Sequence, residues 1–122
     1  MPDDKPRDHS VIASDRVEGT TVFGKDGDKI GTVRRIMIDK ITGQARDVEI
    51  SVGTFFGMGG ELHSLPWEKL NYDTLLDGYK LDVTEDELRN APTHSESDRD
   101  RQYDPDYQRE VYTYWVVTPY WQ

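Results

Sequence analysis

The chain of 122 residues has a formal net charge of −9, from 24 acidic and 15 basic side chains, and only 34% of its residues are hydrophobic. This length leaves room for one domain with a modest core and short extensions. The excess of acid argues against attachment to nucleic acid or anionic lipid by charge, so we expect no direct nucleic-acid partner.

No cysteine is present, which excludes disulfides, thiolate metal sites and cysteine nucleophiles. Residues 1–10 are polar, hold two prolines and lack the apolar run of a secretory signal, so they are predicted to form a flexible leader. No segment approaches the roughly 20 apolar residues of a membrane span. We therefore expect a cytoplasmic protein without a membrane span.

The central part of the chain shows the period of short strands joined by tight turns. Residues 47–52 and 79–84 alternate between polar and apolar side chains, which predicts strands with one buried and one solvated face. Asp47 and Glu49 are therefore expected in solvent. Asp26-Gly27 and Gly43 suit the turns of two successive hairpins, so an antiparallel meander is predicted.

The stretch "SVGTFFGMGGELHSLPW" (residues 51–67) is rich in glycine. Its glycine spacing matches neither a P-loop nor a dinucleotide fingerprint, and no helix pattern follows, so a loop between strands is predicted. Phe55, Phe56 and Met58 at the tip of this loop either contact a partner or fold back to cap one end of the barrel. Both alternatives are open at this point.

A short strand over residues 62–65 should end at Pro66, which cannot donate to a ladder. His63 is expected on its wet or half-wet face. Because neighbours in a strand point to opposite faces, His63 and Ser64 cannot act together as base and nucleophile. Trp67 is predicted to be an anchor in the core or in a dimer interface.

Thr84 and Glu87 have the spacing of a capping box, which predicts a short helix that ends before residues 91–92. The run of residues 93–103 has no aliphatic side chain and is predicted to be a mobile polar linker. Asp104 followed by Pro105 then predicts the start of a second helix.

The C-terminal segment, residues 104–122, combines helical spacing with a high density of rings. Seven aromatic residues lie between positions 103 and 121, and a disordered tail would not be expected to hold so many. The segment should pack on the barrel of its own chain or of a second copy. The candidate interface residues of the whole chain are Phe55, Phe56, Met58, Trp67, Tyr107, Val111, Tyr114, Trp115, Tyr120 and Trp121.

Residues suited to catalysis are dispersed along the sequence. The three histidines are far apart, and those at positions 9 and 94 fall in segments predicted to be flexible, so no metal cage is expected. Most carboxylates fall in turns or on solvated strand faces, and no close buried pair is predicted. We therefore assign no catalytic, metal or cofactor-binding residue.

Four stretches resemble the PRC-barrel family, in its bacterial subgroup of short stand-alone proteins. They are "VIASDRVEGTTVFGKDGDKIGTVRRIMIDKITGQ", "FFGMGGELHSLPWEKL", "GYKLDVTEDEL" and "VYTYWVVTPYW", with Gly31, Asp39 and Leu65-Pro66-Trp67 as the most specific elements. The strand "ARDVEISV" departs from the family because it is more charged than the apolar run of relatives, which predicts a more exposed face there.

The resemblance implies an all-β fold, a small, bent barrel shared with the cytoplasmic domain of the photosynthetic reaction centre H subunit and with the C-terminal domain of a ribosome maturation factor. For this chain we expect an antiparallel barrel of five to six strands, with a short helix and the aromatic C-terminal segment after it. Family members serve as docking modules, and the resemblance supplies no catalytic residues.

These expectations together predict a non-catalytic module for protein–protein interaction or scaffolding. We expect this chain to form a homodimer and to bind a protein partner whose identity the sequence does not give. One alternative is a ribosome or RNA-processing accessory factor that binds basic ribosomal proteins. A further alternative is a barrel that binds a small ligand at the "FFGMGGELH" end.

Overall fold

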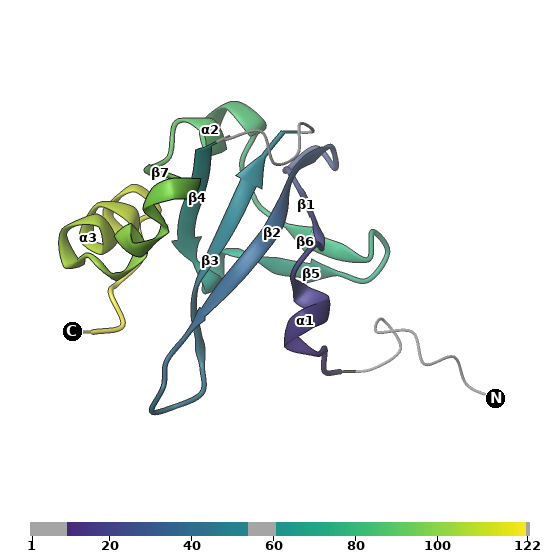
Figure 1. Ribbon diagram of the computed structural model, residues 1–122. Coiled ribbons are helices and arrows are strands. Elements are labelled where there is room, and N and C mark those ends of the chain that lie inside the picture. The colour runs from purple at the N-terminus through teal and green to yellow at the C-terminus, as the bar shows by residue number, and fades with distance from the viewer. Residues whose placement is uncertain (1–9, 54–60, 122) are drawn as a thin grey trace.

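A computed structural model describes residues 10–53 and 61–121 (Figure 1). In chain order its elements are α1 (Ser14–Val17), β1 (Thr21–Phe23), β2 (Lys29–Ile38), β3 (Ala45–Val52), β4 (Glu61–Pro66), η2 (Trp67–Lys69), β5 (Asn71–Asp73), β6 (Gly78–Lys80), α2 (Glu85–Arg89), β7 (Thr93–Ser95), η3 (Glu96–Tyr103) and α3 (Pro105–Tyr114). The strands form one sheet in the order β5-β6-β1-β2-β3-β4-β7.

The fold is mostly β, as expected, but the sheet differs from the predicted closed antiparallel barrel of five to six strands. It has seven strands, and β5 and β7 lie at opposite edges without pairing to each other. Strands β1 and β6 pair in parallel, with Val22 opposite Tyr79, whereas the other neighbours are antiparallel. The sheet has more strands than predicted because each edge is extended. The segment predicted as a linker forms β7 at one edge, and the β5–β6 hairpin pairs with β1 at the other.

Two hairpins of the meander are confirmed. Gly27 and Gly43 have φ angles of 85° and 77°, the left-handed conformation that their turns require. Gly31 serves a different purpose, because a Cβ at this position would lie 2.4 Å from the Ser51 carbonyl oxygen on β3. Only glycine lets β2 and β3 approach this closely, which explains one of the residues that carry the family resemblance.

The apolar face of the central strands forms the core. Val48 and Ile50 of β3 are fully buried together with Val33 of β2, Leu65 of β4 and Leu88 of α2. Burying side chains of this size contributes about 1.5–3 kcal/mol each relative to leaving them exposed. Alternation in β3 thus predicted its core-facing side correctly.

The helix caps are also confirmed. The Thr84 hydroxyl accepts from the Glu87 amide at 3.2 Å and the Glu87 carboxylate accepts from the Thr84 amide at 2.9 Å, so the capping box of α2 forms. The Asp104 carboxylate accepts from the amide of Asp106, with Pro105 in the first turn of α3. Local sequence therefore fixes where both helices begin.

The expectation of a mobile linker over residues 93–103 is wrong, because this segment forms β7 and η3. Strand β7 pairs with β4, placing His94 opposite Leu62. His94 and Gln102 are buried, and both side chains make hydrogen bonds inside the protein. Backbone pairing and internal polar partners thus replace the apolar side chains that the segment lacks.

His63 on β4 also differs from its predicted wet or half-wet position. It pairs in register with Ile50 and is buried, and this burial lowers its pKa. β7 pairs along the edge of its strand, and the backbone of residues 91–92 lies close to its ring. Within the described residues, no helix combines the length and the hydrophobicity that a membrane span needs.

Candidate functional site

The polar face of β3 holds two buried carboxylates, those of Asp47 and Glu49. Glu49 alternates with Val48 and Ile50, so it points away from the core that they form. It was expected in solvent, yet its exposed fraction is 0%. The correction has a structural cause, since His94 of β7 and Arg99 of η3 contact this carboxylate, and Tyr107 of α3 contacts His94.

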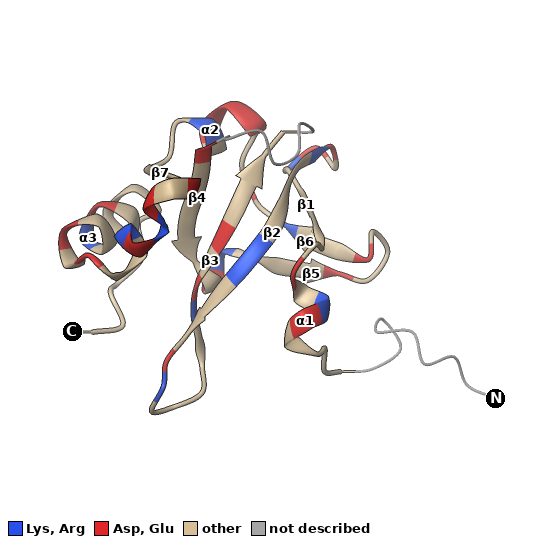
Figure 2. Ribbon diagram, viewed as in Figure 1, with Lys and Arg blue, Asp and Glu red and all other residues tan. Residues whose placement is uncertain are grey.

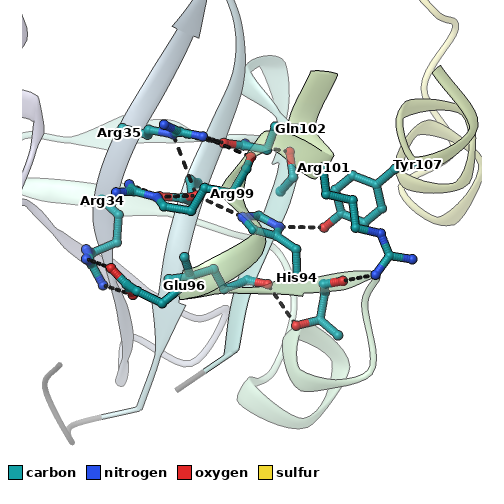
Figure 3. A network of polar contacts seen from close by, with 12 residues as sticks. Arg34, Arg35, His94, Glu96, Arg99, Arg101, Gln102 and Tyr107 are labelled. Carbon is teal, nitrogen blue, oxygen red and sulfur yellow. Dashed lines mark hydrogen bonds and ion pairs between the residues drawn. The ribbon is translucent and has the colours of Figure 1, made fainter. Parts of the chain in front are cut away.

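Glu49 is the centre of a hydrogen-bonded network. Figure 3 labels its partners Arg35, His94 and Arg99. The Nε2 atom of His94 lies 2.8 Å from Glu49 Oε2, and Arg99 donates to both carboxylate oxygens. Arg35 on β2 adds an ion pair at 3.6 Å. The imidazole reaches further, because its Nδ1 atom lies 2.9 Å from the Tyr107 hydroxyl on α3. One carboxylate of β3 thus contacts β2, β7 and η3 directly, and α3 through His94.

These contacts determine the ionisation of Glu49. Burial alone would raise its pKa, but the hydrogen bonds from His94 and Arg99, with the charges of Arg35 and Arg99, hold the pKa at about 2. Glu49 is therefore a carboxylate at every pH where the protein is expected to work. Figure 2 shows the basic band of β2 beside the acidic segment of β3.

A second set of polar contacts holds η3 on the sheet. The Gln102 Oε1 atom accepts from Arg35 Nε and Nη2 at 3.0 and 2.8 Å, and Gln102 Nε2 donates to Ser64 Oγ at 3.1 Å. At the start of η3, Arg34 donates to both oxygens of Glu96 at 2.8 and 3.3 Å. Contacts to β2 and β4 thus hold both ends of η3.

The order Glu49, His94, Tyr107 resembles the connected acid and base groups of some enzymes, but the geometry does not allow access. The side chains of Glu49 and His94 have 0% exposure, and Tyr107 is buried. Neither Glu49 nor His94 lines any of four prominent surface pockets in the described structure. In the described structure these groups instead connect β3, β7 and α3 to one another.

Asp47, two residues before Glu49, is a second carboxylate that was expected in solvent and is buried. Its Oδ1 atom has no hydrogen-bond partner. Burial raises its pKa to about 6, although Arg46 and the nearby Tyr112 hydroxyl act in the opposite direction. That hydroxyl donates to the Arg46 carbonyl oxygen at 3.1 Å. Asp47 therefore lies in an environment that favours its neutral form.

On the other side of the molecule a groove of about 320 Å³ opens between residues 10–12, η2 and the β5–β6 hairpin. Three of its rings pack edge to face. Trp67 and Tyr79 have centroids 5.4 Å apart at 64°, and Tyr72 and Tyr79 have centroids 5.2 Å apart at 78°. The described lining residues are Ser10, Val11, Ile12, Trp67, Leu70, Tyr72 and Tyr79.

This groove matches the chemistry of a docking site. Its walls are mainly aromatic and aliphatic, and the lining residues that the structure describes include no acidic or basic side chain. In the described residues no cluster of three or more histidine or carboxylate side chains is arranged to hold a metal ion. The groove can accept apolar side chains of a partner, because rigid rings offer large contact area at low entropic cost.

The structure separates the candidate interface residues that the sequence grouped together. Trp67 lines the groove, whereas Tyr107, Val111 and Trp115 are buried in the core, so helical spacing predicted an apolar face that the chain itself covers. Tyr114 is partly exposed and donates to the Glu87 carbonyl oxygen at 2.6 Å. Phe55, Phe56 and Met58 lie outside the described residues.

Tyr120 and Trp121 pack on their own chain. Their ring centroids lie 6.0 and 5.0 Å from that of Tyr112 on α3, and the Arg46 guanidinium carbon lies 4.6 Å from the centre of the Tyr120 ring. Both residues are still about two-fifths exposed, at 40% and 39%. The aromatic segment thus docks on its own sheet and helix in this structure.

Sequence reasoning did not identify the Glu49 network or most of the groove. The signal for the network was the unusual charge of "ARDVEISV". Residues 99–102 hold two arginines and a glutamine that can pair with these carboxylates, so the two segments together indicate that the charged face of the strand is buried under residues 99–102. Tyr72 and Tyr79 meet in the groove only because β5 and β6 pair, with these two residues opposite each other. That register is not visible in the sequence.

Comparison with protein families places most of the chain in one of them. The model of the family "PRC-barrel domain" matches residues 9–88, well over half of the chain, and no curated protein matches. The matched region contains β1 to β6, the groove and Glu49, while β7, η3 and α3 follow it. The chain is a member of the PRC-barrel domain family.

Proposed function

We propose that this protein is a non-catalytic docking module that binds a protein partner through the groove of residues 10–12, 67, 70, 72 and 79. The observation that carries this proposal is an accessible, apolar groove on one side of the molecule. The connected acid and base side chains of Glu49 and His94 are buried on the other side. Membership of the PRC-barrel family supports a docking role.

The size of the groove limits what it accepts. A volume of about 320 Å³ lies at the lower end of the range for small-molecule sites, so it suits one or two large apolar side chains of a partner. The net charge of −9 favours a partner with basic groups around those side chains, since complementary charge speeds encounter and selects partners. Buried aromatic contacts would supply most of the affinity.

We include homodimerisation in the proposal. The aromatic residues near the C-terminus remain partly exposed even when docked on their own chain, and such patches favour contact with another protein surface. A dimer would present two grooves to a partner and raise the apparent affinity without any new contact type.

Site-specific photo-crosslinking in the native host tests the groove. A photoreactive amino acid at Val11, which lines the groove and is 77% exposed, should give a discrete adduct with a partner protein. The matched control has the same amino acid at Ile41, which is 93% exposed at the tip of the β2–β3 hairpin, away from the groove (Figure 1). We expect no discrete adduct from this position.

A blocking variant makes the test specific. Tyr72→Lys removes one ring of the groove and places a cation near Asp77, which the Tyr72 hydroxyl contacts in the structure. The adduct from Val11 should be lost in this variant, provided that its thermal unfolding matches that of the wild type. Equal adducts from positions 11 and 41, or an adduct that survives the lysine, would refute the groove as the docking site. An activity of the purified protein that His94→Gln abolishes would refute the non-catalytic part.

A further inference from the structure

Helix α3 ends in an unusual way. The amide of Val116 donates to the Thr113 carbonyl oxygen at 3.2 Å, and the amide of Val117 donates to the Tyr112 carbonyl oxygen at 3.1 Å. This pair of bonds is the Schellman motif, in which the residue after the C-cap is left-handed and is usually glycine. Here it is Val116, with φ 56°. A β-branched side chain in this conformation is strained, because its Cβ crowds the backbone.

The strained residue determines where the end of the chain goes. The turn at Val116 directs residues 117–121 (the tail) back over α3 and the end of β3. The contacts that hold the tail there include Tyr120 and Trp121 against Tyr112, and Arg46 over the Tyr120 ring. Tyr120 and Trp121 stay partly exposed, so their contacts stabilise the docked tail only modestly. These contacts must offset the backbone strain at Val116.

We propose that the tail exchanges between two copies of this protein, so that each copy's tail docks on Arg46 and Tyr112 of the other. Every copy has the receiving surface, and the contacts within one chain show that the tail fits it. Exchange keeps the aromatic and cation–π contacts while Val116 relaxes to an ordinary φ. A strained hinge next to a docked terminal element is the situation in which exchange costs least.

The length of the tail restricts the geometry of such a dimer. Five extended residues span at most about 17 Å, so the two α3 helices must end close to each other, beside the two-fold axis. In Figure 1 the C-terminus and α3 lie on the side of the sheet opposite to α1 and the β5–β6 hairpin. The exchanged dimer therefore leaves both grooves open to partners.

This inference supplies the contact for the homodimer in the proposed function but does not depend on the groove. If the groove crosslinks fail while the tail still exchanges, only the docking proposal falls. If the tail stays in its own chain while the crosslinks succeed, only the exchange falls. The two experiments use different positions, so the outcomes are distinguishable.

The absence of cysteine allows a direct test of exchange. Two single-cysteine variants of the full chain, Arg46→Cys and Tyr120→Cys, are mixed, incubated and treated with a short thiol-reactive cross-linker, because the contact joins the ends of two long side chains and a disulfide needs closer Cβ atoms. Exchange brings the two positions together in different chains, so a cross-linked heterodimer of about twice 14.1 kDa should form. The control mixes Tyr120→Cys with Ile41→Cys, whose cysteine on the hairpin tip is more accessible than that at position 46 and should still give only background.

The hinge supplies a second test by sedimentation over a range of concentrations. Val116→Gly removes the strain, so it should stabilise the tail in its own chain and raise the dissociation constant of the dimer by about 5- to 30-fold per hinge. Removal of residues 118–122 should abolish the dimer. A wild-type protein that stays monomeric, a dimer that survives truncation, or a heterodimer yield no higher than the control would overturn the exchange.

Discussion

Asp47 offers a sharp test of the packing of the C-terminal segment. The carboxylate is buried beneath α3 and the tail, its Oδ1 atom has no hydrogen-bond partner, and its pKa is raised to about 6 from an ordinary value of 3.8. Asp47→Asn keeps the shape of the side chain and removes the charge. We expect this substitution to stabilise the protein at neutral pH.

The sign and size follow from the two pKa values. Between pH 4 and 6 the folded protein holds a proton on Asp47 that the unfolded chain has released, so wild-type stability falls as pH rises through this window. The difference of about 2 between the pKa values corresponds to about 3 kcal/mol of free energy of unfolding above pH 6. The asparagine variant has no such loss.

Urea denaturation at intervals between pH 4 and 7 measures this effect. The free energy of unfolding of the variant minus that of the wild type should grow by about 2–3 kcal/mol across the range and then level off. Asp82→Asn is the control, because Asp82 is exposed and its difference curve should stay flat. A flat difference curve for Asp47→Asn would show that the carboxylate is not sealed by the C-terminal segment, which would refute the packing described here.

Three further substitutions test other parts of the fold. Gly31→Ala places a Cβ against the Ser51 carbonyl oxygen and should cost about 1–3 kcal/mol by overpacking, measured as a lower urea midpoint. Glu49→Gln leaves Arg99 without its buried charged partner and should lower the free energy of unfolding by about 3–5 kcal/mol, seen as a lower thermal midpoint. A decrease below about 1 kcal/mol would contradict a buried network. Thr84→Ala removes the cap of α2 and should cost about 1 kcal/mol in the same assay.

Features determined by neighbouring residues could be predicted from the sequence. The glycine turns at positions 27 and 43, the capping box at Thr84 and the start of α3 at Asp104 each depend on chemistry within about four residues. The core-facing side of β3 followed from simple alternation. These elements needed no knowledge of what lies across the sheet.

The errors all concern contacts between distant segments. Alternation shows that Glu49 and Val48 point to opposite faces, but it does not show which face is wet. Glu49 is buried because His94 and Arg99, about fifty residues later, lie over it. A segment rich in charge is usually a linker, and here the pairing of its charges with those of β2 and β3 makes it part of the fold.

The groove could be predicted only in part for a similar reason. Trp67 was identified as an anchor because a large ring after a proline in a small β fold needs a packing surface. Tyr72 and Tyr79 belong to short strands whose pairing is set by the turn between them and by the parallel contact of β6 with β1. That parallel contact depends on how the whole sheet bends, which local patterns do not encode.

The position of the tail depends, in the end, on the polar network. Helix η3 has Tyr103 as its one large hydrophobic side chain, and that residue is 63% exposed, so apolar burial gives the segment little reason to lie on the sheet. Charge-assisted hydrogen bonds hold it instead, and they are strong only in one geometry, because the Arg99 fork and the Gln102 amide must each meet fixed partners. This directionality sets the position of α3, and therefore the position of Val116. A buried polar network thus places the C-terminal end of the chain, where contact with a second copy is proposed.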